Sequence, residues 1–441
     1  MKKYKKSNID AADENIMKAL KDNTYNRADE IKSFIEGLDL IDSNMFISLD
    51  ARWGEGKTFY IRQIEFTLKY LSKRVLRQDT SDLDPVFVGS KLSSIELENT
   101  YMPIYYNAWL YDCHKDPLMS LLYVLVKECG KYVSTVMDNQ DICDKLLSIF
   151  SPFSLSLPYV QISGNLKNIK ESLEGKDLLE EIKTAEEVRD TLKLILNDII
   201  SESAQKLVIF IDELDRCRPT FAIETLERIK HYFDDERIIF VVSVNKEQLI
   251  HTISKFYGDL FDSTAYLNKF FDVNIYLPEI PKYLKNNSIL QTNREQYYLK
   301  QIVDELSEYY NLSLRDTIIF HQNVENSSKH QCNDHFVQGR MLSIFVPIIL
   351  VLDIVSQPKK SEFMEGKGNT FKELCENIPS LKNMICDFAG DRRMNEENYQ
   401  KGFEKIYRIY ECTFGTNKMY DGELDISRDF KEICIKVCNG N

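Results

Sequence analysis

Long uninterrupted apolar stretches are rare in this 441-residue sequence. The longest, residues 341–355, contains Pro347 and Asp353 and falls short of the roughly 20 apolar residues that a membrane-spanning helix needs. We therefore expect a buried helix there and no transmembrane span. A secretory signal is also lacking, because the basic start MKKYKK is followed by the polar residues SNIDAADEN. The sequence thus predicts a cytoplasmic protein.

Basic residues are outnumbered by acidic ones, 56 to 69, and the formal net charge is −13. A chain of this charge is repelled by nucleic-acid phosphates unless a local basic patch intervenes. The only dense basic run is the N-terminal MKKYKK, which we interpret as a solvated tail. Nucleic acid is therefore a disfavoured partner, although the sequence leaves it open.

Cysteine is also too dispersed to suggest a disulfide framework, since ten cysteines are spread over the whole chain. Without a secretory signal, they are expected to be reduced thiols. One stretch does contain donors of the kinds that bind zinc, namely His321, His330, Cys332 and His335. Its spacing matches no common zinc module, and it is rich in Asn and Ser. We expect a surface loop rather than a metal site.

Short apolar strands alternate with amphipathic helices through the first two thirds of the chain. This pattern predicts an α/β fold, a parallel sheet with helices on both faces. Residues 1–44 form a helical lead-in, residues 45–280 the core and residues 281–441 a mostly helical lid and C-terminal domain. Residues 135–205 are an insert, with a hairpin at 153–163 and a helix at 178–200. Strands are expected at 45–51, 102–111, 206–214, 237–245 and 273–278, helices at 15–40, 58–72, 116–128, from 219 onward and at 246–256, and a loop at 79–100.

The segment ARWGEGKT, residues 51–58, joins the first expected strand to a helix. A loop that cradles phosphates needs converging backbone N–H groups, an ammonium group and a hydroxyl for the metal ion. Gly54 and Gly56 permit the unusual backbone angles, and Lys57 and Thr58 supply the ammonium and the hydroxyl. The first glycine of the usual pattern is replaced by Ala51. The residues expected to bind nucleotide are Arg52, Trp53, Gly54, Glu55, Gly56, Lys57, Thr58 and Phe59.

A second half of the site is expected where the strand LVIFIDELD ends. Asp212 is placed to hold Mg²⁺ together with Thr58, and Glu213 to orient and polarise the attacking water. The alternative is that the two acids only cap the following helix. Asn245 ends the next strand, where a polar side chain can sense the γ-phosphate. ATP is the expected nucleotide, because Gln248 in the segment NKEQ replaces the Asp that would recognise guanine.

On these residues the chain resembles the KAP family of P-loop NTPases, which are distant relatives of the AAA+ and STAND groups. Five segments carry the resemblance across residues 45–280. Ala51 and the pair Asp212–Glu213 depart from the usual family glycine and Asp-Asp pair. Many members also carry transmembrane helices between the two motifs, whereas residues 135–205 contain none, so the resemblance is to a soluble member. The segments are ARWGEGKTFYIRQI, YYNAWLY, VIFIDELDRCRPTFAIETLERIKHYF, IIFVVSVNKEQLIHTISKFYG and AYLNKFFDVNIYLP.

The resemblance implies roles for several basic residues. Arg216 and Arg218 match family positions, where they either pair with acids such as Asp215 or face a neighbouring subunit. Lys269 lies where AAA+ proteins often place a catalytic finger, the alternative being a solvated lysine. Arg392 or Arg393 could act as a second sensor of the γ-phosphate, the alternative being surface salt bridges.

The resulting expectation is a Mg²⁺-dependent ATPase that couples ATP binding and hydrolysis to a change in conformation or assembly. Self-association or a partner effector protein is implied, and bacterial relatives are associated with the exclusion of phage. Two alternatives stay open. One is an ATP-binding switch or scaffold with little turnover, and the other is a DNA-stimulated remodelling ATPase.

Overall fold

The computed structural model describes residues 10–114, 116–133, 204–280, 297–328, 336–389, 395–415 and 429–439, with the single residues 190, 193, 197 and 427. The described chain forms two compact units, which divide after Pro278. The first contains the sheet and the second is helical. The predicted hairpin at 153–163 lies outside the described residues, and so does most of the predicted helix at 178–200.

A five-stranded parallel sheet with the order β2-β3-β4-β1-β5 forms the centre of the first unit. Every residue of β3 and β4 is buried, which explains why these strands are continuous apolar runs. The predicted second strand is shorter than expected. Asn107 accepts a hydrogen bond from the backbone N–H of Leu110, so residues 108–111 form a 3₁₀ turn. The strands are β1 Met45–Asp50, β2 Tyr101–Asn107, β3 Lys206–Asp212, β4 Ile238–Val244 and β5 Val273–Tyr276.

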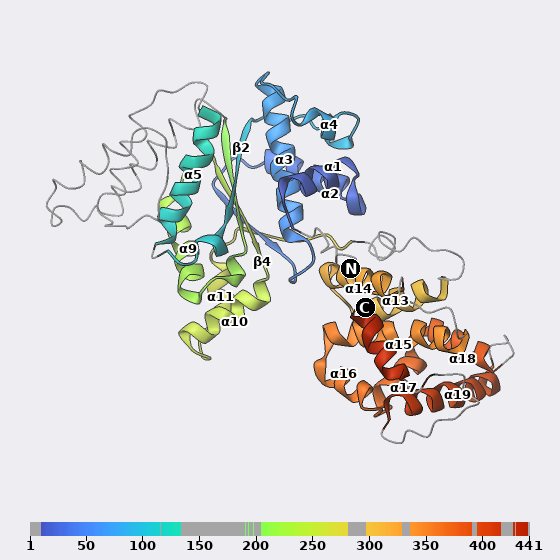
Figure 1. Ribbon diagram of the computed structural model, residues 1–441. Helices are drawn as coiled ribbons and strands as arrows, with labels where there is room; N and C mark the ends of the chain where they lie inside the picture. The colour runs from blue at the N-terminus through green and yellow to red at the C-terminus, as the bar shows by residue number, and fades with distance from the viewer. Residues whose placement is uncertain are drawn as a thin grey trace, which may run out of the picture. The chain divides into compact units, whose positions relative to one another are not determined.

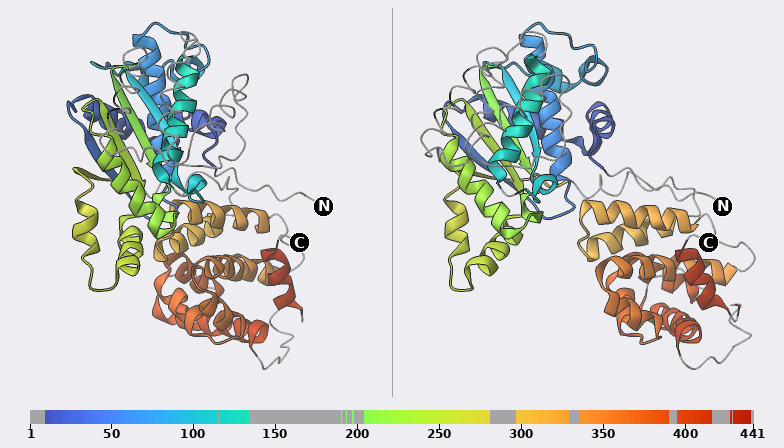
Figure 2. Two further views of the ribbon diagram at one scale, coloured as in Figure 1. Left: turned by 90° about the vertical axis from the view of Figure 1, so that its left-hand side faces the viewer. Right: turned by 60° about the vertical axis from the view of Figure 1, so that its left-hand side comes forward.

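Helices cover both faces of this sheet, as Figures 1 and 2 show. Each face has its own apolar core, because alternate strand residues point to opposite sides. The predicted α/β class is therefore confirmed. One face carries α1 Asp13–Lys21, α2 Ala28–Asp39, α3 Lys57–Val75 and α4 Asp84–Phe87, and the other carries α5 Pro117–Val133, α9 Pro219–Tyr232, α10 Lys246–Tyr257 and α11 Ser263–Asn268.

Residues 79–100, expected to be a loop, contain α4 and a 3₁₀ turn at Lys91–Ser94. Phe87 is fully buried and stacks on Tyr70 of α3, with ring centroids 4.4 Å apart. Leu92 is buried in the same core. The prediction was wrong because these few apolar side chains, among acidic and serine residues, are ordered by tertiary packing rather than by local propensity.

Thr100 and Gln205 fasten the beginnings of β2 and β3 to each other. The side-chain oxygen of Gln205 accepts from the backbone N–H of Thr100 at 2.9 Å, and the Thr100 hydroxyl accepts from the Gln205 N–H at 3.1 Å. The Thr100 carbonyl also accepts from the N–H groups of Gln205 and Lys206. These bonds set the register with which β3 enters the sheet beside β2.

The second unit is helical throughout its described part. Its longest helix, α15 Phe336–Val355, is the one described helix long and apolar enough to cross a bilayer, and 67% of that stretch is buried. The predicted buried helix is thus confirmed. Phe345 lies at the centre of an aromatic cluster in this unit. The other helices are α13 Tyr297–Tyr309, α14 Leu314–Ser328, α16 Gln357–Met364, α17 Asn369–Asn377, α18 Pro379–Phe388, α19 Glu396–Phe414 and α20 Phe430–Cys438.

Candidate functional site

The loop between β1 and α3 has the backbone geometry of a phosphate cradle. Gly54 and Gly56 have φ angles of 85° and 88°, which side chains other than glycine rarely adopt. Gly56 precedes the first residue of α3, so the N–H groups of that helix end are directed into the loop. Ala51 continues the ladder of β1 by donating its N–H to the Val244 carbonyl at 3.2 Å, and it does not adopt a positive φ. A glycine is therefore not required at residue 51.

Lys57 lies inside this loop. Its ammonium donates to the carbonyl oxygens of Ala51 and Arg52, at 2.6 and 3.3 Å. The side chain is buried, and burial lowers its pKa. The ammonium group is thus held by two carbonyl oxygens at the base of the cradle, with the Asp215 carboxylate 4.0 Å away, and an anionic phosphate would bind it more strongly than the carbonyl groups do.

Asp212 meets the loop from the end of β3. The Thr58 hydroxyl donates to its carboxylate at 2.7 Å, which joins residues 154 positions apart in the sequence. The hydroxyl of Tyr105 on β2 donates to the same oxygen at 3.1 Å. Asp212 is only 1% exposed, and burial raises its pKa. A cation beside Asp212 would offset the cost of burying its negative charge. A hydroxyl and a carboxylate are oxygen ligands of the kind that Mg²⁺ prefers, so these residues fit this ion.

Glu213 follows Asp212 with a φ of 60°, an uncommon left-handed conformation outside glycine. Its carboxylate lies 2.9 Å from the guanidinium of Arg216, which also lies over the ring of Trp109 at 5.4 Å. The Arg216 side chain thus holds Glu213 from one side. Arg218, in contrast, pairs with Asp112 at 3.1 Å.

Asn245 is buried at the end of β4. Its side-chain oxygen accepts from the backbone N–H of Gln248 at 3.2 Å, and its own N–H donates to Asp215 at 2.8 Å. The segment NKEQ therefore forms the capped first turn of α10. Lys246 in this segment donates to the Asn274 side chain at 2.7 Å.

The remaining residues predicted for the site are placed differently. Arg52 is exposed and pairs with Glu55 at 3.4 Å, and Phe59 packs against the core. Lys269 is exposed after α11, with no hydrogen bond or ion pair to the described loop residues. Arg392 and Arg393 lie outside the described residues.

The predicted surface loop at 321–335 begins inside the helical unit. His321 belongs to α14, is fully buried and lies 3.3 Å from the Ser307 hydroxyl. This residue is therefore not on a surface loop as expected, because α14 continues to Ser328 and buries it. His330, Cys332 and His335 fall outside the described residues, and the part of the chain that the structure describes has no group of three or more His, Cys, Asp or Glu side chains that could hold a metal ion.

Two residues of the site and one beneath it were not among the residues predicted for the site. Tyr105 and Asp215 contact the site directly, as described for Asp212 and Asn245. Arg27 is buried beside α2 and donates to the backbone carbonyl of Glu55 in the loop at 3.4 Å. The available signals were that Tyr105 begins the segment YYNAWLY and that Asp215 lies in the segment with LDRCRP, whereas no signal was found for Arg27.

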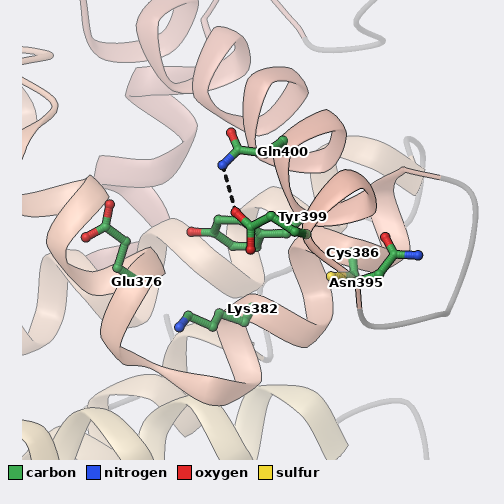
Figure 3. Close-up of a pocket in the computed structure, with 7 residues that line it drawn as sticks. Glu376, Lys382, Cys386, Asn395, Tyr399 and Gln400 are labelled. Atoms are coloured by element: carbon green, nitrogen blue, oxygen red, sulfur yellow. Dashed lines mark hydrogen bonds between the residues drawn. The ribbon is translucent and has the colours of Figure 1, made fainter.

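A separate cleft lies in the helical unit between α17, α18 and α19. Figure 3 shows Tyr399 pointing toward Glu376 across it, with Lys382 below. Gln400 donates to Glu396 at 3.0 Å. Burial raises the pKa of Tyr399 to about 12. With two carboxylates against one lysine and no glycine loop, this cleft lacks the features of a phosphate site.

Comparison with known proteins agrees with this geometry. The KAP family P-loop domain matches residues 12–329, which is most of the chain. No curated protein matches. Among solved structures, the Aeropyrum pernix ORC2 protein in its ADPNP–ADP complexes matches at 13% identity, with 100% of this chain and 96% of that chain covered. Its TM-score of 0.30 is too low to support an argument. The family match confirms the resemblance drawn from the sequence: the chain belongs to the KAP family of P-loop NTPases.

Proposed function

We propose that this protein is a Mg²⁺-dependent ATPase that couples ATP binding and hydrolysis to a change in conformation or assembly. The observation that carries the proposal is the 2.7 Å hydrogen bond between Thr58 and Asp212, which joins the two halves of the site beside the ammonium group of Lys57. An isolated glycine loop would not bring a buried carboxylate to this hydroxyl.

Each residue has a distinct role in this proposal. Lys57 and the loop N–H groups bind the phosphates, and Thr58 and Asp212 would hold the metal ion. When bound, Mg²⁺ offsets the negative charge of the phosphates. Glu213 orients and polarises the water that attacks the γ-phosphate. Asn245 contributes its side-chain NH₂, since its oxygen already caps α10.

ATP is preferred over GTP in this proposal because the NKEQ segment is used as a helix cap. Gln248 contributes its backbone N–H to that cap, and its side chain is an amide rather than the carboxylate that accepts two hydrogen bonds from guanine. Competition of ATP and GTP for the site, measured by calorimetry, tests this preference.

A Glu213→Gln variant tests the proposed chemistry. The amide keeps the size of the side chain but cannot accept a proton, so turnover should fall by about 10²-fold or more while ATP affinity stays within a few-fold. Phosphate release and calorimetric affinity should be measured for both proteins, with particle size recorded with and without ATP. Unchanged turnover in Glu213→Gln would mean that this residue is not the catalytic group.

A nucleotide-binding switch with little turnover is the second candidate. The observation that favours it is the ion pair between Glu213 and Arg216, which engages the carboxylate that hydrolysis requires. Tight ATP binding by the wild type, with a single-turnover rate that Glu213→Gln does not change, would select the switch. DNA-stimulated turnover with a steep salt dependence would instead revive the remodelling alternative.

Family membership also suggests a biological setting, the exclusion of phage by bacterial cells. We propose it as the process that the nucleotide cycle serves, with a partner effector or self-association as the output. Plating efficiency of phage on cells expressing wild type or Glu213→Gln tests this setting. Equal plating efficiency on both, and on cells without the protein, would argue against it for the phages used.

A further inference from the structure

One carboxylate oxygen gathers three donor groups of the nucleotide site. The Oδ2 atom of Asp215 accepts from the indole N–H of Trp53 at 2.7 Å and from the backbone N–H of Asn245 at 2.8 Å. The ammonium group of Lys57 lies 4.0 Å from the same atom, and the Asp215 side chain is 2% exposed. The loop, the end of β3 and the end of β4 therefore meet at this single oxygen.

Trp53 is the residue that carries this contact into the loop. The residue is 46% exposed, although the only polar atom of its side chain is bound to Asp215. The next residue, Gly54, adopts a φ of 85°, so the chain reverses direction directly after the anchored tryptophan. The bond between the indole and Asp215 thus adds a side-chain tether to a loop that Lys57 and Arg27 hold only through its backbone carbonyl groups.

The carboxylate of Asp215 has the charge and the acceptor chemistry of a phosphate oxygen. A triphosphate bound by Lys57 would bring further negative charge toward Asp215, and the two anions would compete for the same ammonium group. A bound triphosphate would therefore draw the ammonium group away from Asp215 and weaken the set of contacts that this carboxylate makes.

We propose that the Trp53–Asp215 hydrogen bond is a latch that ties the phosphate-binding loop to the end of β3 and opens when the triphosphate binds. The proposal rests on the nucleotide binding proposed above and names the contact that regulates it. Asp215 acts through Lys57 and Trp53 rather than on the reacting atoms, so it is a positioning residue.

The latch can be followed through Trp53 itself, because the chain has only two tryptophans. In a Trp109→Phe protein, Trp53 is the sole indole fluorophore. Titration with Mg²⁺ and a slowly hydrolysed ATP analogue should shift its emission to longer wavelength, because the indole loses its partner and becomes more hydrated. Unchanged emission at a concentration where calorimetry shows saturation would overturn the latch and leave nucleotide binding intact.

Affinity gives a second readout. Trp53→Phe removes the donor, and Asp215→Asn removes the charge while keeping an acceptor oxygen. Each should bind the analogue about tenfold more tightly, because the bond to a charged acceptor no longer has to break before binding. The double variant should gain little beyond either single variant, since both act on one contact. Asp259→Asn, at an exposed residue of the same unit, is the matched control.

The outcomes separate the latch from the proposed function. Weaker or unchanged binding by both Trp53→Phe and Asp215→Asn, with normal binding by wild type, overturns the latch alone. Absence of binding by every protein, wild type included, overturns both. If Asp215→Asn fails to fold, the emission experiment still decides, because it leaves Asp215 intact.

Discussion

Replacing Asp212 by asparagine should stabilise the ligand-free protein and abolish its response to nucleotide. The side chain keeps its size, and the amide oxygen can still accept from Thr58 and Tyr105. What changes is the buried charge. Burial raises the pKa of Asp212 above its ordinary value of 3.8, so the folded protein binds this proton more tightly than the unfolded chain does. The carboxyl group therefore favours folding fully below about pH 4, and this contribution is lost as the pH rises through the folded-state pKa.

At a pH above the folded-state pKa the wild type has lost this contribution, whereas Asp212→Asn has no proton to lose. Each tenfold change in proton affinity is worth about 1.4 kcal/mol. For a unit as large as Asp10–Pro278, 1 kcal/mol corresponds to roughly 2 °C in melting temperature. The ligand-free variant should thus melt a few degrees higher. With MgATP at a hundred times its Kd, the wild type should gain about 2.7 kcal/mol, or roughly 5 °C, and the variant almost nothing.

Differential scanning calorimetry at pH 7, with and without MgATP, measures both effects, and Asp259→Asn serves as the control. The variant should melt above wild type without MgATP and below wild type with MgATP. Repeating the ligand-free scan at lower pH should bring the two proteins together. A ligand-free variant that melts well below wild type would refute the reasoning from buried charge, and an undiminished MgATP shift would refute the assignment of Asp212 to the metal.

Two further predictions concern Tyr105, which the sequence did not assign to the site, and His321, which lies in a buried helix rather than on the predicted surface loop. Tyr105→Phe removes a donor to the Asp212 carboxylate, a bond worth about 1.5–3 kcal/mol of stability, so the variant should melt roughly 3–6 °C below wild type without nucleotide; an unchanged melting temperature would count against it. Burial lowers the pKa of His321 to about 4, so its stabilisation is present above about pH 6.5 and about 3 kcal/mol is lost as the pH falls through 4. His321→Gln should reduce this loss of stability at acid pH, measured by hydrogen exchange in α14. Asp304 lies 3.7 Å away, and its pKa is raised to about 6, so its own contribution to stability decreases as the pH rises.

The sheet and the phosphate loop could be predicted because their signals are local. Strands buried on both faces must be apolar throughout, and only glycine readily takes the angles found at Gly54 and Gly56. The pairing of Thr58 with Asp212 followed from the rule that parallel strands end at one edge of a sheet. The helix predicted at 58–72 continues to Val75 in the structure. The prediction ended too early because the last buried residue of this helix is Ser72, and the periodic apolar signal ends there.

The partners of the site residues could not be predicted, because they depend on register and side-chain direction. Tyr105 reaches Asp212 only because β2 pairs with β3 so that Asn107 lies opposite Asp212. Asp215 looks like one of several acids in its segment until the 3₁₀ turn at Leu214–Arg216 directs it toward Trp53. No pattern within a single segment records either contact.

The bonds between Thr100 and Gln205 have a consequence for how this protein can vary. They fix the point where the chain re-enters the sheet, at the opposite edge from the loop that carries Lys57. Lengthening a connection between two fixed points costs little entropy. The connection between α5 and β3 can therefore be replaced by a longer or chemically different one without changing the register of β3 in the sheet. The edge of the sheet that carries Asp212 is thus separated from changes in this connection by the length of β3.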